Sequence, residues 1–333
     1  MTLSHVPVML DEVLHALEPR EGALYIDGTF GAGGYSRGIL SAADCRLIGI
    51  DRDPGVRPAA DHLRQASGER FAFVQAPFSA MEEVIKSSGG EAVDGIVLDI
   101  GVSSMQIDQA ERGFSFSRPG PLDMRMARDG ATAADAVNRL SEQELADIFY
   151  VYGEERKSRR IAKFIIAARK DEPIETTDRL ANIVSRAMGG KHSKIHPATR
   201  VFQALRIFIN DELGELARAL TASERLLKPL GRLVVVTFHS LEDRMVKTFL
   251  RSRSGGAGGG GSRHAPAIET GPAPSFKILH RKAMTASEAE IEVNPRSRSA
   301  KLRAAIRTDA PAWSDEVVSN GNVIPLSRLE AVL

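Results

Sequence analysis

Near its N-terminus the chain reads Leu24-Tyr-Ile-Asp-Gly-Thr-Phe-Gly-Ala-Gly-Gly34, a short apolar run followed by an aspartate and a glycine-rich loop. Glycines in such a loop let a ligand approach the backbone where a helix begins. A dinucleotide-binding loop has the pattern Gly-x-Gly-x-x-Gly, but counting from Gly31 the third glycine position holds Ser36. The loop therefore predicts a nucleotide-like ligand and weakens the case for NAD.

The same pattern of an apolar run, a break and a helical stretch recurs through the first hundred residues. Further apolar runs lie at 47–50, 71–74 and 96–98, and helical candidates lie between the runs near 34–41, 55–66 and 79–87. Crossovers of this length join parallel strands. We therefore predict an α/β fold with a doubly wound, Rossmann-like sheet, whose ligands bind at the carboxyl ends of the strands.

Three of the four predicted strands end in an aspartate, namely Asp27, Asp51 and Asp99. Carboxylates at the strand ends repel a pyrophosphate but attract an ammonium or a sulfonium group. Asp27 is expected near the methionine end of such a ligand, and Asp51 can accept hydrogen bonds from two ribose hydroxyls. This combination favours S-adenosylmethionine as the cofactor. A tight turn with ordinary surface aspartates is the alternative interpretation.

The strand pattern stops between about 106 and 227, where apolar residues follow helical spacing instead. Strand character resumes at 233–238 after a predicted turn at 229–231, and 300–307 is a further strand with a partner at 276–279. We therefore expect a sheet domain interrupted by an all-helical insertion. Its predicted parts are the first part of the sheet domain (1–106), the inserted helical domain (107–214), and the second part with a basic C-terminal region (215–333).

Composition excludes several classes of protein. The 333 residues are 43% hydrophobic and 26% charged, which argues against a disordered or fibrous chain. A lone cysteine, Cys45, excludes an internal disulfide and thiolate zinc sites, and Pro197 disrupts the helix that would align His192 with His196, so no metal site is expected. Residues 1–12 lack the blocks of a signal peptide, and no apolar run is long enough to cross a membrane. The expected location is the cytoplasm, without a membrane partner.

Charge is distributed unevenly, although the formal net charge is only +1. Between 251 and 303 there are ten Lys or Arg residues and four acidic ones, and five more cations crowd 156–163 beside an apolar helix face. Such segments either bind a polyanion or form a solvated surface. The inserted helical domain and the basic tail are therefore the regions expected to bind a polyanion. The glycine-rich stretch 254–262 is assigned no role.

Eight ordered blocks of the chain resemble the bacterial ribosomal RNA small subunit methyltransferase H family, also called MraW. The blocks are Asp27-Gly-Thr-Phe-Gly-Ala-Gly-Gly34, Asp51-Arg-Asp-Pro54, Asp99-Ile-Gly-Val-Ser-Ser104, Arg112-Gly-Phe-Ser-Phe116, Pro121-Leu-Asp-Met-Arg-Met126, Tyr152-Gly-Glu-Glu-Arg156, His196-Pro-Ala-Thr-Arg200 and Phe238-His-Ser-Leu-Glu-Asp-Arg244. The resemblance implies a class I methyltransferase fold. It also implies a cytoplasmic enzyme that uses S-adenosylmethionine to methylate N4 of one cytidine in 16S ribosomal RNA near the decoding site. The inserted helical domain and the basic tail are then the regions expected to face this RNA.

The resemblance further implies a set of cofactor-binding positions. Carried over block by block, they are Gly33, Gly34, Tyr35, Asp51, Phe78, Asp99 and Gln106. Tyr35 stands where the family has a histidine, and Met105 where it has a proline. A contact made by the Tyr35 backbone survives this change, whereas one that needs an imidazole does not.

The implied reaction needs hydrogen-bond acceptors beside the sulfonium, because the lone pair of a cytosine amino group is delocalised into the ring. Asp99 is the first candidate, and His239 and Ser240 are placed to border the pocket after the fifth strand. The alternative is that Asp99 serves only the cofactor and that His239-Ser240 caps a helix beginning near Glu242.

Two other functions stay open at this stage. One is an NAD-linked oxidoreductase, and the other is a ribosome-assembly protein that binds RNA without catalysis. The sequence also leaves open whether the chain forms a homodimer and whether free 16S ribosomal RNA or the assembled small ribosomal subunit is the partner.

Overall fold

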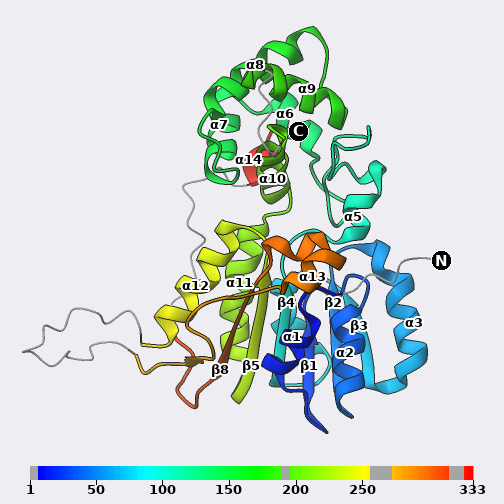
Figure 1. Ribbon diagram of the computed structural model, residues 1–333, viewed down its shortest axis with the longest axis vertical. Coiled ribbons are helices and arrows are strands. Elements are labelled where there is room, and N and C mark those ends of the chain that lie inside the picture. Colours follow the sequence, from blue (N-terminus) through cyan, green and yellow to red (C-terminus); the bar gives the residue numbers. More distant parts are fainter. Residues whose placement is uncertain (1–6, 190–195, 256–271, 315–325, 333) are drawn as a thin grey trace, which may run out of the picture. The chain divides into compact units, whose positions relative to one another are not determined.

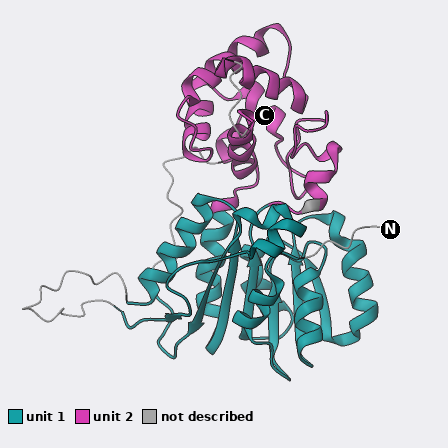
Figure 2. Ribbon diagram, viewed as in Figure 1, with its two compact units in different colours: residues 1–101, 214–319 teal, residues 102–213, 320–333 magenta. Residues whose placement is uncertain are grey.

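The computed structural model describes residues 7–189, 196–255, 272–314 and 326–332 (Figure 1). The chain divides into two compact units (Figure 2). Unit 1 comprises residues 1–101 and 214–319, and unit 2 comprises residues 102–213 and 320–333. The prediction places 320–333 with the sheet, whereas the described residues 326–332 pack against the core of unit 2. The expected glycine-rich stretch at 254–262 lies largely outside the described residues.

Unit 1 is built on an eight-stranded sheet in the order β3-β2-β1-β4-β5-β8-β6, with β7 paired to β8. The first five strands pair in parallel and β8 runs antiparallel to β5. The strands are β1 (Leu24–Asp27), β2 (Arg46–Asp51), β3 (Phe71–Gln75), β4 (Val93–Asp99), β5 (Leu227–Thr237), β6 (Phe276–Ile278), β7 (Met284–Thr285) and β8 (Lys301–Arg307). The prediction of a doubly wound α/β sheet with late strands at 276–279 and 300–307 is confirmed.

Helices cover both faces of this sheet. On one face, Ile26, Leu98 and Leu233 join a buried apolar cluster with α4 (Met81–Ser87), α11 (Glu212–Leu226) and α12 (Ser240–Arg253). The opposite face packs against α1 (Leu10–Leu17), α2 (Gly34–Ala42) and α3 (Arg57–Ser67). Alternate strand residues point to opposite faces, so both sets of helices bury apolar side chains of the same strands. The short helix α13 (Glu288–Val293) and the 3₁₀ turns Pro54–Val56, Gly68–Arg70, Phe78–Ala80 and Pro295–Ser299 complete the unit.

The fifth strand is longer than the sequence predicts. It begins at Leu227 and therefore includes the expected turn at 229–231. The register with β4 shifts there, and Leu230 adopts a positive φ of 68°. The proline and glycine thus form an irregularity within the strand rather than separating it from the helix before it.

A buried cluster around Glu224 of α11 joins the last strands to the rest of unit 1. Its carboxylate accepts hydrogen bonds from Arg253 Nε (3.0 Å), Ser275 Oγ (2.5 Å) and the Trp313 backbone N–H (3.1 Å). The Arg253 guanidinium lies 4.4 Å from the Trp313 ring centroid. Glu224 therefore fixes the end of α12, the start of β6 and the segment after β8 at one point.

Unit 2 is helical within its described residues. Its helices are α5 (Ser104–Asp108), α6 (Ala133–Arg139), α7 (Glu142–Val151), α8 (Ser158–Asp171), α9 (Thr177–Met188), α10 (Ala198–Ile209) and α14 (Leu326–Glu330), with a 3₁₀ turn at Ala110–Arg112. One apolar core includes Leu145, Ile161, Leu180 and Leu205, and Leu329 of α14 is buried in it. Thr132 and Ser141 begin α6 and α7 with capping boxes. No helix in the described part of the chain combines the length and apolar character needed to span a membrane.

Candidate active site

Three carboxylates meet at the carboxyl ends of adjacent strands. Asp27 ends β1, Asp51 ends β2 and Asp99 ends β4, and β1 lies between the other two in the sheet. Their charges interact, because Asp51 raises the pKa of Asp27 and Asp27 raises the pKa of Asp99. The sequence prediction that strand-end aspartates gather at one edge is confirmed.

Asp27 is fully buried and holds the first loop together. One carboxylate oxygen accepts a hydrogen bond from Ser36 Oγ (2.7 Å), and the other accepts one from the Thr29 backbone N–H (3.3 Å). Burial raises the pKa of Asp27 to about 6, against the lowering effect of these bonds. Asp27 therefore acts on a ligand through its field rather than by contact, which differs from its expected place beside the ligand. Ser36, the residue that breaks the dinucleotide pattern, is the partner of this buried acid.

Asp51 organises the opposite side of the same loop. Its carboxylate oxygens accept hydrogen bonds from the backbone N–H groups of Gly31 and Asp53, each at 2.8 Å. Burial raises its pKa to about 6. The side chain remains partly exposed, and each oxygen has a second lone pair. These free lone pairs can accept the paired hydroxyls of a ribose.

Asp99 is the acceptor without a partner. Its backbone N–H donates to Thr29 Oγ1 (2.6 Å), whereas its carboxylate oxygen Oδ1 is buried and has no hydrogen-bond partner among the described residues. Burial, followed by the negative charges of Asp27 and Glu242, raises the pKa of Asp99 to about 8. An unpaired buried oxygen in a negative field is suited to a cation or an N–H donor.

The glycines of the first loop allow close packing of the backbone against neighbouring side chains. Gly33 has a φ of 73° and begins α2, a conformation that favours glycine. A Cβ on Gly28 would lie 2.5 Å from the side chain of Leu98 and 3.3 Å from Phe78 Cβ. Phe78, expected as an apolar wall for adenine, is thus packed beside the loop. On Gly34 an added Cβ would collide with Pro7, so this position too requires glycine.

The side chain of Tyr35 points into the protein. Its hydroxyl donates to the Val8 carbonyl oxygen at 2.5 Å, and its ring is buried. Burial raises the pKa of Tyr35 well above its usual value. A ligand can therefore use only the backbone at this position, which is the kind of contact that survives the replacement of histidine.

His239 caps α12, as the structural alternative in the sequence analysis holds. Its Nδ1 accepts a hydrogen bond from the Glu242 backbone N–H (3.5 Å), and Glu242 Oε2 accepts from the His239 backbone N–H (3.2 Å). His239 Nε2 also lies 2.7 Å from Glu242 Oε1. Both ring nitrogens thus face one fully buried glutamate, while Ser240 is exposed.

Gln106 belongs to unit 2, whereas the other candidate residues belong to unit 1. It lies in α5, where its side-chain oxygen accepts from the Ser103 backbone N–H (3.0 Å) and its backbone N–H donates to Ser103 Oγ (3.2 Å). This capping box holds the buried amide in place.

Three residues of this site carry roles that the sequence analysis does not assign. Thr29 accepts from the backbone of Asp99, Ser36 holds Asp27, and Glu242 adds to the negative field at Asp99. Ser36 had a signal, because it occupies the position where the expected glycine is missing. The sequence signal for Glu242 is weaker: it stands three residues after His239, at the capping-box position.

The model of the MraW methylase family matches residues 2–308. The chain belongs to the MraW methylase family. Proteins named ribosomal RNA small subunit methyltransferase H are similar to it: that of Maricaulis maris is 78% identical over 99% of this chain and 98% of its own length. That of Caulobacter vibrioides (strain NA1000 / CB15N) is 59% identical over 93% and 97%, and that of Hyphomonas neptunium 55% identical over 98% and 95%. Membership of the MraW methylase family makes the chain a methyltransferase and excludes the NAD-linked oxidoreductase.

Proposed function

We propose that this protein transfers a methyl group from S-adenosylmethionine to N4 of a cytidine in small-subunit ribosomal RNA, near the decoding site, in the cytoplasm. The observation that carries the proposal is the cluster of three coupled carboxylates at the strand ends, with one oxygen of Asp99 left without a partner. Family membership supports the reaction class and the negative field supports the cofactor, whose sulfonium and ammonium groups are cationic.

The residues of unit 1 suit the parts of this cofactor. The backbone of Gly33, Gly34 and Tyr35 offers close approach at the start of α2, and Asp51 offers acceptors for the ribose hydroxyls. Phe78 supplies an apolar surface for adenine. Gln106 is proposed as a further cofactor contact from unit 2. When bound, S-adenosylmethionine supplies a methyl group that is activated by its sulfonium.

Asp99 is the proposed acceptor for the amino group of the target base. The nitrogen gains positive charge as it takes the methyl group, and a carboxylate beside it stabilises that charge. Burial and the charges of Asp27 and Glu242 raise the pKa of Asp99 to about 8, and a bound cation would lower it again. Asp99 would then be ionised, and its carboxylate would hold and finally accept an amino proton.

His239 and Ser240 are proposed to border the same pocket. The contacts of His239 with Glu242 fix its ring and bring the buried Glu242 charge to the end of β5. We assign His239 to positioning this charge, and Ser240 to contact with the substrate because its side chain is exposed.

Ribosomal RNA is proposed to contact unit 2 and the basic C-terminal region. The five cations expected on one segment are all exposed: Arg156, Lys157, Arg159, Arg160 and Lys163. The last three belong to α8, whose Ile161 and Ile165 are buried. A cationic surface on a packed helix suits a phosphate backbone.

Methyl transfer is the direct test. Purified protein is incubated with methyl-tritiated S-adenosylmethionine and small ribosomal subunits or naked 16S ribosomal RNA from cells that lack the protein, and the modified nucleotide is mapped by mass spectrometry. We expect label in one N4-methylated cytidine, and none with Asp99→Asn. Absence of label in both substrates would contradict the proposal and support a non-catalytic RNA-binding protein.

Cofactor identity is tested separately by thermal shift. S-adenosylhomocysteine should raise the melting temperature, because a ligand that binds the folded state stabilises it, and NADH should not. Stabilisation by NADH alone would overturn the assignment of the pocket.

A further inference from the structure

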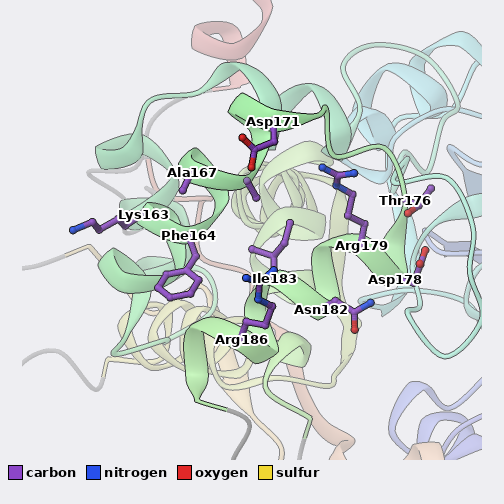
Figure 3. A pocket seen from close by; sticks show the side chains of 11 residues that line it. Lys163, Phe164, Ala167, Asp171, Thr176, Asp178, Arg179, Asn182, Ile183 and Arg186 are labelled. Carbon is purple, nitrogen blue, oxygen red and sulfur yellow. The ribbon is translucent and has the colours of Figure 1, made fainter.

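A pocket of about 760 Å³ lies in unit 2 between α8 and α9 (Figure 3). Only residues 172–176 join these helices, so they run in opposite directions along the pocket. Lys163 and Phe164 of α8 therefore face the later part of α9, including Arg186, and Asp171 faces its first turn. The pocket has two chemically different ends.

The floor of the pocket is apolar and offers a flat surface. Ile183 is buried, Ala168 and the Phe164 ring are partly buried, and Figure 3 shows Phe164 and Ile183 beside each other. The Arg160 guanidinium lies 5.8 Å from the centroid of the Phe164 ring. A planar group can stack on such a ring, and a cation that neighbours the ring strengthens attraction for an electron-rich base.

The rim at one end is cationic. Lys163 and Arg186 are exposed, and neither makes a side-chain hydrogen bond or ion pair with the rest of the described chain. The amide of Asn182 is exposed between this rim and the floor. Unpaired cations beside an apolar floor match a nucleotide, whose phosphate is anionic and whose base is planar.

The other end of the pocket is not available to a phosphate. Arg179 donates to the Glu172 carboxylate and to its backbone oxygen (2.8 Å), so its charge is already balanced. Asp171 and Asp178 line the pocket at this end and would repel a phosphate. The electrostatics therefore fix one orientation, with the phosphate at Lys163 and Arg186 and the base directed along the floor.

We propose that this pocket holds one unpaired nucleotide of the RNA substrate, away from the base that is methylated. The base stacks on Phe164 and is contacted by the Asn182 amide, and its phosphate lies between Lys163 and Arg186. The inference rests on the proposed function for the identity of the ligand, but RNA binding can be measured without methylation. The pocket adds affinity for RNA and takes no part in chemistry.

The experiment compares two double variants, Lys163→Gln with Arg186→Gln and the control Lys86→Gln with Arg64→Gln. The control removes one exposed lysine and one exposed arginine of unit 1, neither of which lines the pocket. Binding of a fluorescent single-stranded 16S fragment is measured against salt, together with kcat and KM for methylation. We expect the pocket variant to raise Kd and KM about tenfold and to reduce the slope of log Kd against log salt by about 0.7, the value for one lost phosphate contact. Its kcat and its affinity for S-adenosylhomocysteine should match those of the control.

A second variant and a crosslink test the base rather than the phosphate. Phe164→Leu keeps an apolar side chain and should weaken RNA binding about fivefold without changing the salt slope. RNA containing 4-thiouridine should crosslink to a peptide from 158–188. Equal RNA affinity and salt slope in the pocket and control variants would overturn the inference. A defect seen with assembled subunits but not with naked RNA would also overturn it, because that result would indicate a protein partner. Wild-type protein that binds the fragment through the pocket yet never methylates it would refute the proposed function alone.

Discussion

The strand ends of unit 1 and the helix α8 of unit 2 both concentrate charge, but in opposite ways. Asp27, Asp51 and Asp99 are acidic and buried or partly buried. The carboxylates of Asp27 and Asp51 accept hydrogen bonds from nearby atoms of the chain, whereas Oδ1 of Asp99 has no partner among the described residues. The cations of α8 other than Arg169 are exposed, and most of these make no fixed contact within the described residues. Buried charges have strong individual effects, whereas exposed ones are screened by solvent and act as a group. The first arrangement suits one small cationic ligand and the second suits a long polyanion.

The largest expected effect comes from the unpaired acid. Asp99→Asn keeps the shape of the side chain but removes the charge that accepts the amino proton, so kcat should fall about 100- to 1,000-fold. Single-turnover methylation at saturating cofactor and RNA measures this. A kcat within threefold of the wild type would show that Asp99 serves only the cofactor.

The same substitution should stabilise the protein at high pH, which controls for misfolding. With a folded pKa of about 8, Asp99 keeps a proton that the unfolded chain releases near pH 4. The free energy of unfolding therefore decreases as pH rises between these values. Asp99→Asn removes this loss, and its melting temperature at pH 8.5 should exceed that of the wild type.

Asp51→Ala should weaken cofactor binding by about 1 to 3 kcal/mol, because the ribose hydroxyls lose their acceptors. The backbone N–H groups of Gly31 and Asp53 lose theirs as well. Isothermal titration calorimetry with S-adenosylhomocysteine measures the change, and Asp61→Ala, an exposed acid of α3, is the matched control. Unchanged affinity would remove Asp51 from the site.

Ser36→Ala tests whether the buried acid needs its hydroxyl partner. Asp27 would lose its shortest hydrogen bond and keep those from the backbone N–H groups of Thr29 and position 36. Loss of this buried bond to a carboxylate should lower the free energy of unfolding by about 1 to 2 kcal/mol. Urea unfolding measures the loss. Ser87→Ala, which removes an exposed hydroxyl at the end of α4, should have almost no effect.

Cofactor affinity should rise with pH. Without cofactor the raised pKa values of Asp51 (about 6) and Asp99 (about 8) keep part of the site neutral, and a cation binds the ionised form better. The affinity should therefore increase about three- to tenfold from pH 6 to pH 8.5. Binding near neutral pH should also release protons, so the binding enthalpy measured by calorimetry should change with the ionisation enthalpy of the buffer. In Asp99→Asn the upper part of this increase should disappear, and a flat wild-type profile would contradict the proposed charge state.

The smallest expected effect concerns one exposed cation. Arg159→Gln removes a single charge from the α8 surface, so RNA affinity should fall only about two- to threefold and the salt slope by about 0.7. Fluorescence anisotropy with the RNA fragment at several salt concentrations measures both values. Cofactor affinity should not change, and a large loss of kcat would show that the two regions are not independent in the way that their burial suggests.

The sequence predicts the sheet better than the site. Apolar runs that alternate with helical stretches along the chain predict the parallel strands, and the aspartates after these runs predict which edge of the sheet carries the chemistry. Both signals are local in sequence. The site depends on three-dimensional contacts that no local pattern gives. Tyr35 points inward to Val8, Ser36 pairs with Asp27 across the first loop, and Glu242 affects the distant Asp99. The pocket between α8 and α9 is also absent from the sequence analysis, since its residues show ordinary amphipathic spacing.

The contacts of Glu224 join the parts of unit 1 that precede and follow the stretch 256–271, so the fold need not depend on an unbroken chain there. This one carboxylate holds Arg253 before the stretch 256–271 and Ser275 after it, and the Phe249 and Phe276 rings lie 5.7 Å apart across the same junction. A gene split within that stretch should therefore give two polypeptides that associate into the complete sheet when they are produced together. The junction offers a place to build a switchable version of the enzyme, whose assembly is controlled by fused dimerisation partners.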